Sequence, residues 1–124
     1  ILTNRGLFRA SVYREKDGNL VAAASVYLLR LQDKDISPEF LAVFLNSRTG
    51  QTLLKQCIRG ATIPSLPKSC LSTLQIPIPS EEMQELIVNI NNNHLRRSQL
   101  YEKRSRLHKE VAEAAISNLL TPHP

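Results

Sequence analysis

The stretch GATIPSLPKSCLSTLQIPIPSEEMQ, residues 60–84, decides the fold, because it places four prolines between two regions that both have helical patterns. Proline lacks a backbone N–H donor and restricts the conformation of the residue before it. No long regular element can therefore run through this stretch. We interpret it as a joint, interrupted at Pro64, Pro67, Pro77 and Pro79.

The region after the joint is predicted to be one long helix, residues 80–120. Ser80 supplies a capping hydroxyl, and three acids follow in the first turns, where the helix dipole favours them. Nearly forty residues without proline or glycine correspond to roughly 57 Å of helix at about 1.5 Å per residue. Heptad spacing, with polar residues at several core positions, connects Leu86, Ile90, Asn93, Arg97, Leu100, Arg104, Leu107, Val111, Ala114 and Asn118. We expect a partner helix to pair with Leu86, Ile90, Leu100, Leu107 and Val111.

The region before the joint also has a helical signal. Ser37-Pro38-Glu39 combines a capping hydroxyl, a proline at the first helical position and an acid in the first turn. Thr49-Gly50 interrupts the apolar pattern, and Gly60 is a typical helix stop. We therefore expect two short helices or one bent helix. Their apolar faces consist of Phe40, Leu41, Phe44 and Leu45, then Leu53, Leu54, Cys57 and Ile58.

The front of the chain is predicted to form an antiparallel hairpin. Residues 7–14 and 20–31 are rich in apolar and β-branched side chains, and Asp17-Gly18 between them is a strong turn signal. The predicted fold class is therefore α+β: a small globular domain with an antiparallel sheet and helices, residues 1–79, followed by a long C-terminal α-helix forming coiled-coil contacts.

Composition sets further expectations. None of the apolar runs approaches the about eighteen residues of a membrane span, and the first residues lack a secretion pattern, so we expect a cytoplasmic protein without a membrane partner. Cys57 and Cys70 are too few for a disulfide framework, and we interpret both as reduced packing residues. The chain starts at Ile1 and its sole methionine is Met83, which indicates a piece of a longer protein.

The net charge of +5 is unevenly distributed. Residues 1–79 contain ten Lys/Arg against five acids, whereas residues 80–124 contain six of each. An excess of cations suits a surface that binds phosphates, because neutralising phosphates releases condensed counterions. A merely solvated basic surface is the alternative that charge alone leaves open.

The joint and its flanks carry a resemblance. Gly60-Ala61-Thr62, Leu66, Lys68, Leu71, Leu74 and IPIPSEEMQELI, running into a heptad helix, resemble the end of a target recognition domain in the specificity subunits of type I restriction-modification enzymes. The preceding PEFLAVFLNSRTGQTLL resembles the helix that this family places before its glycine-threonine turn. The family's full subunit has two such domains and two long helices. This chain is therefore expected to be an excerpt of such a subunit or of a methylase fusion.

The resemblance implies a DNA-binding, sequence-specific recognition module that reads one half of a split target in double-stranded DNA. It implies a spacer helix that pairs with a helix from the same subunit or a second copy, and it implies DNA methyltransferase and restriction subunits as partners. Side chains such as Arg, Asn and Gln read base edges, whereas phosphate contacts position the protein. From the exposed polar sites near basic residues, we predict DNA contacts at Arg14, Lys16, Asn19, Arg59, Thr62 and Lys68.

The sequence favours a non-catalytic role. It contains neither the glycine-rich cofactor loop nor the Asn/Asp-Pro-Pro-aromatic segment of an amino-methyltransferase, nor clustered nuclease carboxylates, so no cofactor is predicted. His94, His108 and His123 lack partners at zinc-like spacing, so no metal is predicted. The alternative function is a protein-interaction adaptor that oligomerises through its long helix. The target bases and the oligomeric state are not specified by the sequence.

Overall fold

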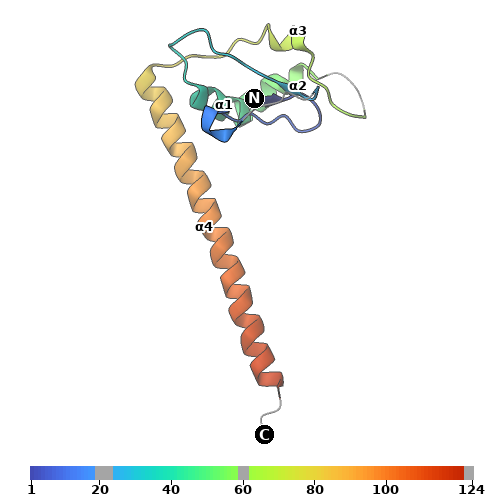
Figure 1. Ribbon diagram of the computed structural model, residues 1–124, viewed down its shortest axis with the longest axis vertical. Helices are drawn as coiled ribbons and strands as arrows, with labels where there is room; N and C mark the ends of the chain where they lie inside the picture. The colour runs from blue at the N-terminus through green and yellow to red at the C-terminus, as the bar shows by residue number, and fades with distance from the viewer. Residues whose placement is uncertain (19–23, 59–61, 122–124) are drawn as a thin grey trace. The chain divides into compact units, whose positions relative to one another are not determined.

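The structure is a computed structural model that describes residues 1–18, 24–58 and 62–121 (Figure 1). It is a mixed α+β fold, mostly helical, as predicted. Its elements are β1 (Leu2–Thr3), the short 3-10 helix η1 (Glu15–Asp17), β2 (Val26–Tyr27), α1 (Pro38–Asn46), α2 (Arg48–Gln56), α3 (Lys68–Leu71) and α4 (Glu81–Leu120). The chain divides into two compact units, Ile1–Val88 and Asn89–Pro124.

The predicted helix start at Ser37 is confirmed, and the helical region is two helices. The Ser37 hydroxyl accepts a hydrogen bond from the backbone N–H of Phe40 at 3.0 Å. The break lies at Ser47, which ends α1 and caps α2 by accepting from the Gly50 N–H at 3.1 Å. Gly50 itself is helical, so the break predicted at Thr49-Gly50 is displaced. A Cβ on Gly50 would lie 2.0 Å from the carbonyl oxygen of Phe44, so only glycine permits this close approach of α2 to α1.

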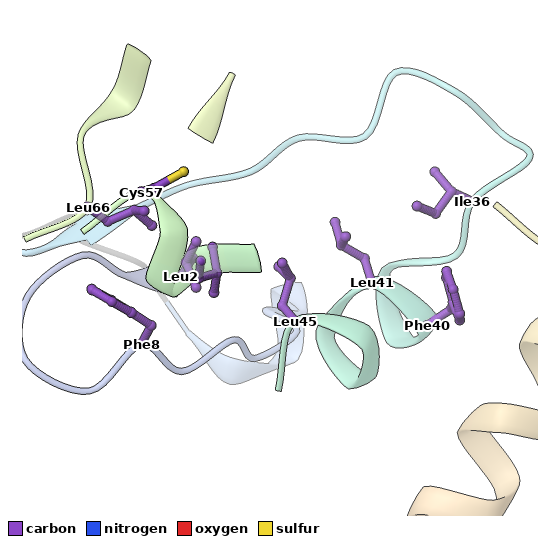
Figure 2. Close-up of a cluster of buried hydrophobic side chains, with 9 residues drawn as sticks. Leu2, Phe8, Ile36, Phe40, Leu41, Leu45, Cys57 and Leu66 are labelled. Carbon is purple, nitrogen blue, oxygen red and sulfur yellow. The ribbon is translucent and has the colours of Figure 1, made fainter. Parts of the chain in front are cut away.

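A small apolar core holds the first unit together. Leu41 and Leu45 of α1 gather with Leu2 of β1 and Phe8, as Figure 2 shows. Leu2 and Leu54 are fully buried. Among the described residues, the buried core consists of Leu2, Phe8, Ile36, Phe40, Leu41, Leu45, Leu54, Cys57 and Leu66. The faces predicted for the two short helices therefore point into this core, with Phe44 and Ile58 packed against it. Leu53, predicted in the same face, is half-buried and lies outside this cluster.

The predicted hairpin is wrong in its partner strand. β2 pairs antiparallel with β1, with Leu2 opposite Tyr27. Within the described residues, the contribution of residues 7–14 to the sheet is an isolated bridge from Ala10 to Leu2. Near the predicted turn, residues 15–17 form η1, and Gly18 has a positive φ of 93°. Residues 20–23 of the predicted second strand lie outside the described residues.

Competing hydrogen bonds explain this difference. The side-chain amide of Asn46 accepts from the Ala10 N–H and donates to the Ala10 carbonyl, both at 2.8 Å. Both backbone groups of Ala10 are therefore already paired with a side chain of α1, so at this residue they are not available to a strand at residues 24–31. Instead, residues 10–13 and 28–31 both line a hollow of about 750 Å³ beside α1.

The two cysteines are joined, so the prediction that both are reduced is wrong. Cys57 directly follows α2 and Cys70 lies in α3, and their Cα atoms are 5.7 Å apart in a disulfide. The single turn of α3 inside the joint brings Cys70 back to the core. A spacing of 13 residues carries no signal for such a return.

The first turns of α4 belong to the first unit. Gln84 is the buried residue of this helix, and its amide makes three hydrogen bonds. Its oxygen accepts from the Ser37 N–H at 2.9 Å, and its nitrogen donates to the carbonyls of Asp35 at 2.6 Å and Pro79 at 3.0 Å. Ile87 and Val88 pack against the core. The joint is therefore fastened to the helix cap at Ser37 by a side chain, in addition to being stiffened by its prolines.

The second unit has no core of its own among its described residues. From residue 89 to residue 121 no side chain is buried, although α4 continues as regular helix to Leu120. The 40 residues of α4 correspond to about 60 Å at ~1.5 Å per residue, which agrees with the predicted length.

Candidate nucleic-acid interface

The predicted DNA contacts fall into two groups in the structure. Arg14 and Lys16 lie at η1, where the Arg14 guanidinium forms an ion pair with Glu39 of α1 at 2.9 Å. Both partners are partly exposed, so solvent weakens this pair. Lys16 is exposed. Asn19 and Arg59 lie outside the described residues.

Thr62 and Lys68 form the second group, on a different part of the same unit. Both are exposed, and the backbone between them is firmly held. Pro64 accepts a hydrogen bond from Gly6 and Leu66 donates one to Asn4, each at 3.0 Å. The hydroxyl of Tyr27 also donates to the Leu66 carbonyl at 2.8 Å. Residues 62–68, which we call the joint segment, thus lie beside residues 4–6, whereas Arg14 is bonded to α1.

Sequence reasoning missed this neighbour, the loop of residues 3–9, which we call the N-terminal loop. The Thr3 N–H donates to the Arg9 carbonyl at 3.0 Å, and the Thr3 hydroxyl both donates to the Leu7 carbonyl at 2.7 Å and accepts from the Arg9 N–H at 2.8 Å. Gly6 has a φ of 71°, a conformation that favours glycine. The signal was present as a glycine between two apolar segments. Asp17-Gly18 is the stronger turn signal of the two, because Asp-Gly is a preferred hairpin turn pair.

The charges of these segments are one-sided. Residues 1–14 and 40–80 contain seven Lys/Arg and no acid at all. The five acids of the front region all lie within residues 15–39. The N-terminal loop and the adjoining joint segment therefore meet without any carboxylate in either sequence. This is the charge arrangement that a phosphate backbone requires.

The predicted helix-pairing residues are all exposed. Exposure ranges from 49% for Leu107 to 69% for Val111, with Leu86, Ile90 and Leu100 between them. Charge along α4 is segregated: residues 91–109 contain six Lys/Arg and one acid, whereas the acids of the helix otherwise lie near its two ends. One exposed ion pair, Lys109 to Glu113 at 3.8 Å, lies on this helix. An apolar stripe of this kind is consistent with a coiled coil.

Residues 1–18, 24–58 and 62–121 contain no group of three or more His, Cys, Asp or Glu side chains that could hold a metal ion. In the same residues, no helix is long and apolar enough to cross a membrane. A second hollow, of about 590 Å³, surrounds Gln84 and is lined in part by Asp33, Asp35, Glu81 and Glu85. Its acidic lining does not suit a polyanion.

The fold and its charges define a class of protein. It is a small α+β domain in which two segments without acidic residues meet, and the chain continues into a long helix whose apolar stripe is exposed. The family model of the type I restriction modification DNA specificity domain matches residues 1–107. The chain therefore belongs to that family, which confirms the resemblance inferred from the joint. No curated protein and no solved structure matches the chain.

Proposed function

We propose that this chain reads one half of a split DNA target within a type I restriction-modification system. In this proposal residues 1–79 form the DNA-reading part, and residues 80–120 form a spacer that positions the methyltransferase and restriction subunits. The observation that carries it is the pair of acid-free segments that meet at residues 4–6 and 64–66. Because the chain belongs to the DNA specificity family, DNA is the polyanion that we propose for this surface. A cytoplasmic setting, with access to DNA, belongs to the same proposal.

The predicted contacts divide by their chemistry. Lys16 and Lys68 are exposed point charges suited to phosphates, whereas Thr62 offers a hydroxyl to a base edge or a phosphate. Arg14 reaches DNA only if it leaves Glu39. Asn19 and Arg59 remain contacts proposed from the sequence. None of these roles includes chemistry on the DNA, so we propose a non-catalytic component without a cofactor.

The spacer role rests on the exposed stripe of α4. Helices pair through such stripes when a second helix supplies matching apolar positions. The cation-rich middle of α4 favours a partner with acids opposite residues 91–109. A second copy paired antiparallel about this middle would bring like charges together, which costs free energy. We therefore propose that the preferred partner is another helix of the same subunit, with self-pairing as the weaker substitute.

A salt series tests the DNA role. Binding of the chain to a 30-bp random-sequence duplex should weaken steeply as salt rises, because each neutralised phosphate contributes about −0.9 to the slope of log K against log salt. Four contacts would give a slope of about −3.6. The measurement is fluorescence anisotropy between about 50 and 200 mM salt. A flat response would overturn the proposal and favour the adaptor.

Sedimentation tests the spacer. The chain should associate, and its association should strengthen with salt because screening reduces repulsion between the cation-rich helix middles. This is the opposite of the salt effect expected for DNA binding. The matched variants are Leu100→Ala, on the stripe, and Gln99→Ala, beside it; only the first should weaken association. A strictly monomeric profile with full helicity would contradict the pairing.

A further inference from the structure

Among the described residues of the first unit, the N-terminal loop carries the most exposed large apolar side chain. Leu7 at its tip is 77% exposed, although the backbone around it is fixed. Its carbonyl is held by the Thr3 hydroxyl, and the preceding Gly6 N–H is held by the Pro64 carbonyl. Ile63, beside Pro64, is 63% exposed. Two large apolar side chains therefore stand in water on adjoining segments that hydrogen bonds keep together.

Cations flank this apolar tip. Arg5 and Arg9 are both exposed, and neither guanidinium forms an ion pair with any residue in the described ranges. Arg5 lies opposite Ser65 in an antiparallel bridge, so it is fixed next to the joint segment. The nearest acid along the sequence is Glu15, which lies at η1. Apolar tips surrounded by unpaired cations match the edge of a DNA groove, which offers apolar base surface between two rows of phosphates.

We infer that the N-terminal loop is a DNA-contacting element, with Leu7 making an apolar base contact in a groove and Arg5 and Arg9 neutralising the flanking phosphates. The inference rests on the proposed DNA role and adds residues outside the set predicted from the sequence. The hydrogen bonds of Thr3 and Gly6 hold the tip in place before DNA arrives. Little conformational entropy is then lost on binding.

Salt dependence separates the two kinds of contact. An apolar contact changes affinity without changing the salt slope, whereas loss of a phosphate contact reduces the slope by about 1. Duplexes enriched by the wild-type chain from a random 30-bp pool provide the probe, because base contacts matter only on preferred sequences. Leu7→Ala should weaken binding to the enriched duplexes about tenfold at an unchanged slope. Arg5→Ala and Arg9→Ala should each reduce the slope by about 1 on enriched and random duplexes alike.

Matched controls keep the outcomes distinct. Leu95→Ala removes a leucine of the second unit that is 51% exposed, and Lys34→Ala removes a cation that lies between two acids in the sequence. Both should leave affinity and slope unchanged. Because Leu7, Arg5 and Arg9 are exposed, their variants should have the same urea midpoint of unfolding as the wild-type chain. An unchanged midpoint shows that the variants are folded.

The outcomes separate this inference from the proposed function. If the wild-type chain binds duplexes with a steep salt slope and the loop variants behave like their controls, the loop inference is wrong and the DNA role stands. If the wild-type chain shows no salt-dependent binding, the DNA role fails and the loop inference fails with it.

Discussion

The two units of this chain contain leucines in opposite situations. In the first unit Leu54 is fully buried, whereas in the second Leu107 is 49% exposed on a regular helix. Burial of a leucine side chain is worth about 1.5–3 kcal/mol, so the first unit carries its own stabilisation. A helix within a protein gains most of its stability from packing of its apolar face. The comparison teaches that the first unit has an apolar core of its own, whereas the apolar stripe of the second unit is open to the proposed pairing with another helix.

The sharpest test of this comparison uses matched leucines. Leu54→Ala should destabilise the first unit by about 2–5 kcal/mol, because it removes packed atoms and leaves a cavity. Leu107→Ala should change the unfolding free energy of the first unit by less than about 0.5 kcal/mol, because Leu107 lies in the second unit and its side chain is exposed. Urea unfolding followed by tyrosine fluorescence measures both. Equal effects would mean that the stripe is already covered in the free chain.

The disulfide gives the next largest expected effect. Cys57–Cys70 closes a loop of about the length for which chain entropy predicts roughly 3 kcal/mol. Replacing both residues, Cys57→Ala with Cys70→Ala, should lower the unfolding free energy of the first unit by about 2–3 kcal/mol and leave the helicity of α4 intact. Thiol alkylation followed by mass measurement shows whether the unmodified chain carries the bond. Full alkylation without reduction would disprove it.

Gln84 tests how the joint is fastened within the first unit. Gln84→Ala removes three part-buried hydrogen bonds and leaves backbone groups of residues 35, 37 and 79 without this partner, which should cost about 1–3 kcal/mol. Gln99→Ala, on the second unit, is the control and should cost nothing measurable. Hydrogen exchange at the Ser37 N–H reports the same loss locally. Unchanged protection there would show that the prolines alone hold the joint.

Local signals predicted the helices of this fold. Ser37-Pro38-Glu39 predicted the start of α1, and the absence of proline and glycine after Ser80 predicted α4. Both signals are local, because capping and helix breaking depend on neighbours in sequence. The sheet was mispredicted because the partner of Val26–Tyr27 is only two residues long and 23 positions away, at Leu2–Thr3. No pattern in so short a strand marks it. The side-chain bonds of Asn46 and Gln84 were equally invisible, because each joins segments distant in sequence.

The candidate interface was predicted only in part, because it too depends on contacts between segments distant in sequence. The excess of cations before residue 80 is a property of composition, so it can be predicted from the sequence. Which cations lie together is a property of the tertiary fold. The joint segment lies beside Arg5 only because Gly6 turns the chain back toward Pro64. Arg9 lies within the predicted strand of residues 7–14, but in the structure its N–H closes the N-terminal loop by donating to the Thr3 hydroxyl.

The ion pair between Arg14 and Glu39 gives the smallest expected effect. Breaking it tests whether Arg14 can leave Glu39 and contact a DNA phosphate. Glu39→Gln removes the charge that holds Arg14, and since the pair is partly exposed, stability should fall by less than about 1 kcal/mol. If Arg14 contacts a phosphate, its release should strengthen duplex binding and steepen the salt slope by up to about 1. The double variant, with Arg14→Ala added, should remove the gain. A gain that persists without Arg14 would assign it to the loss of a negative charge near the DNA, and Arg14 would leave the set of DNA contacts.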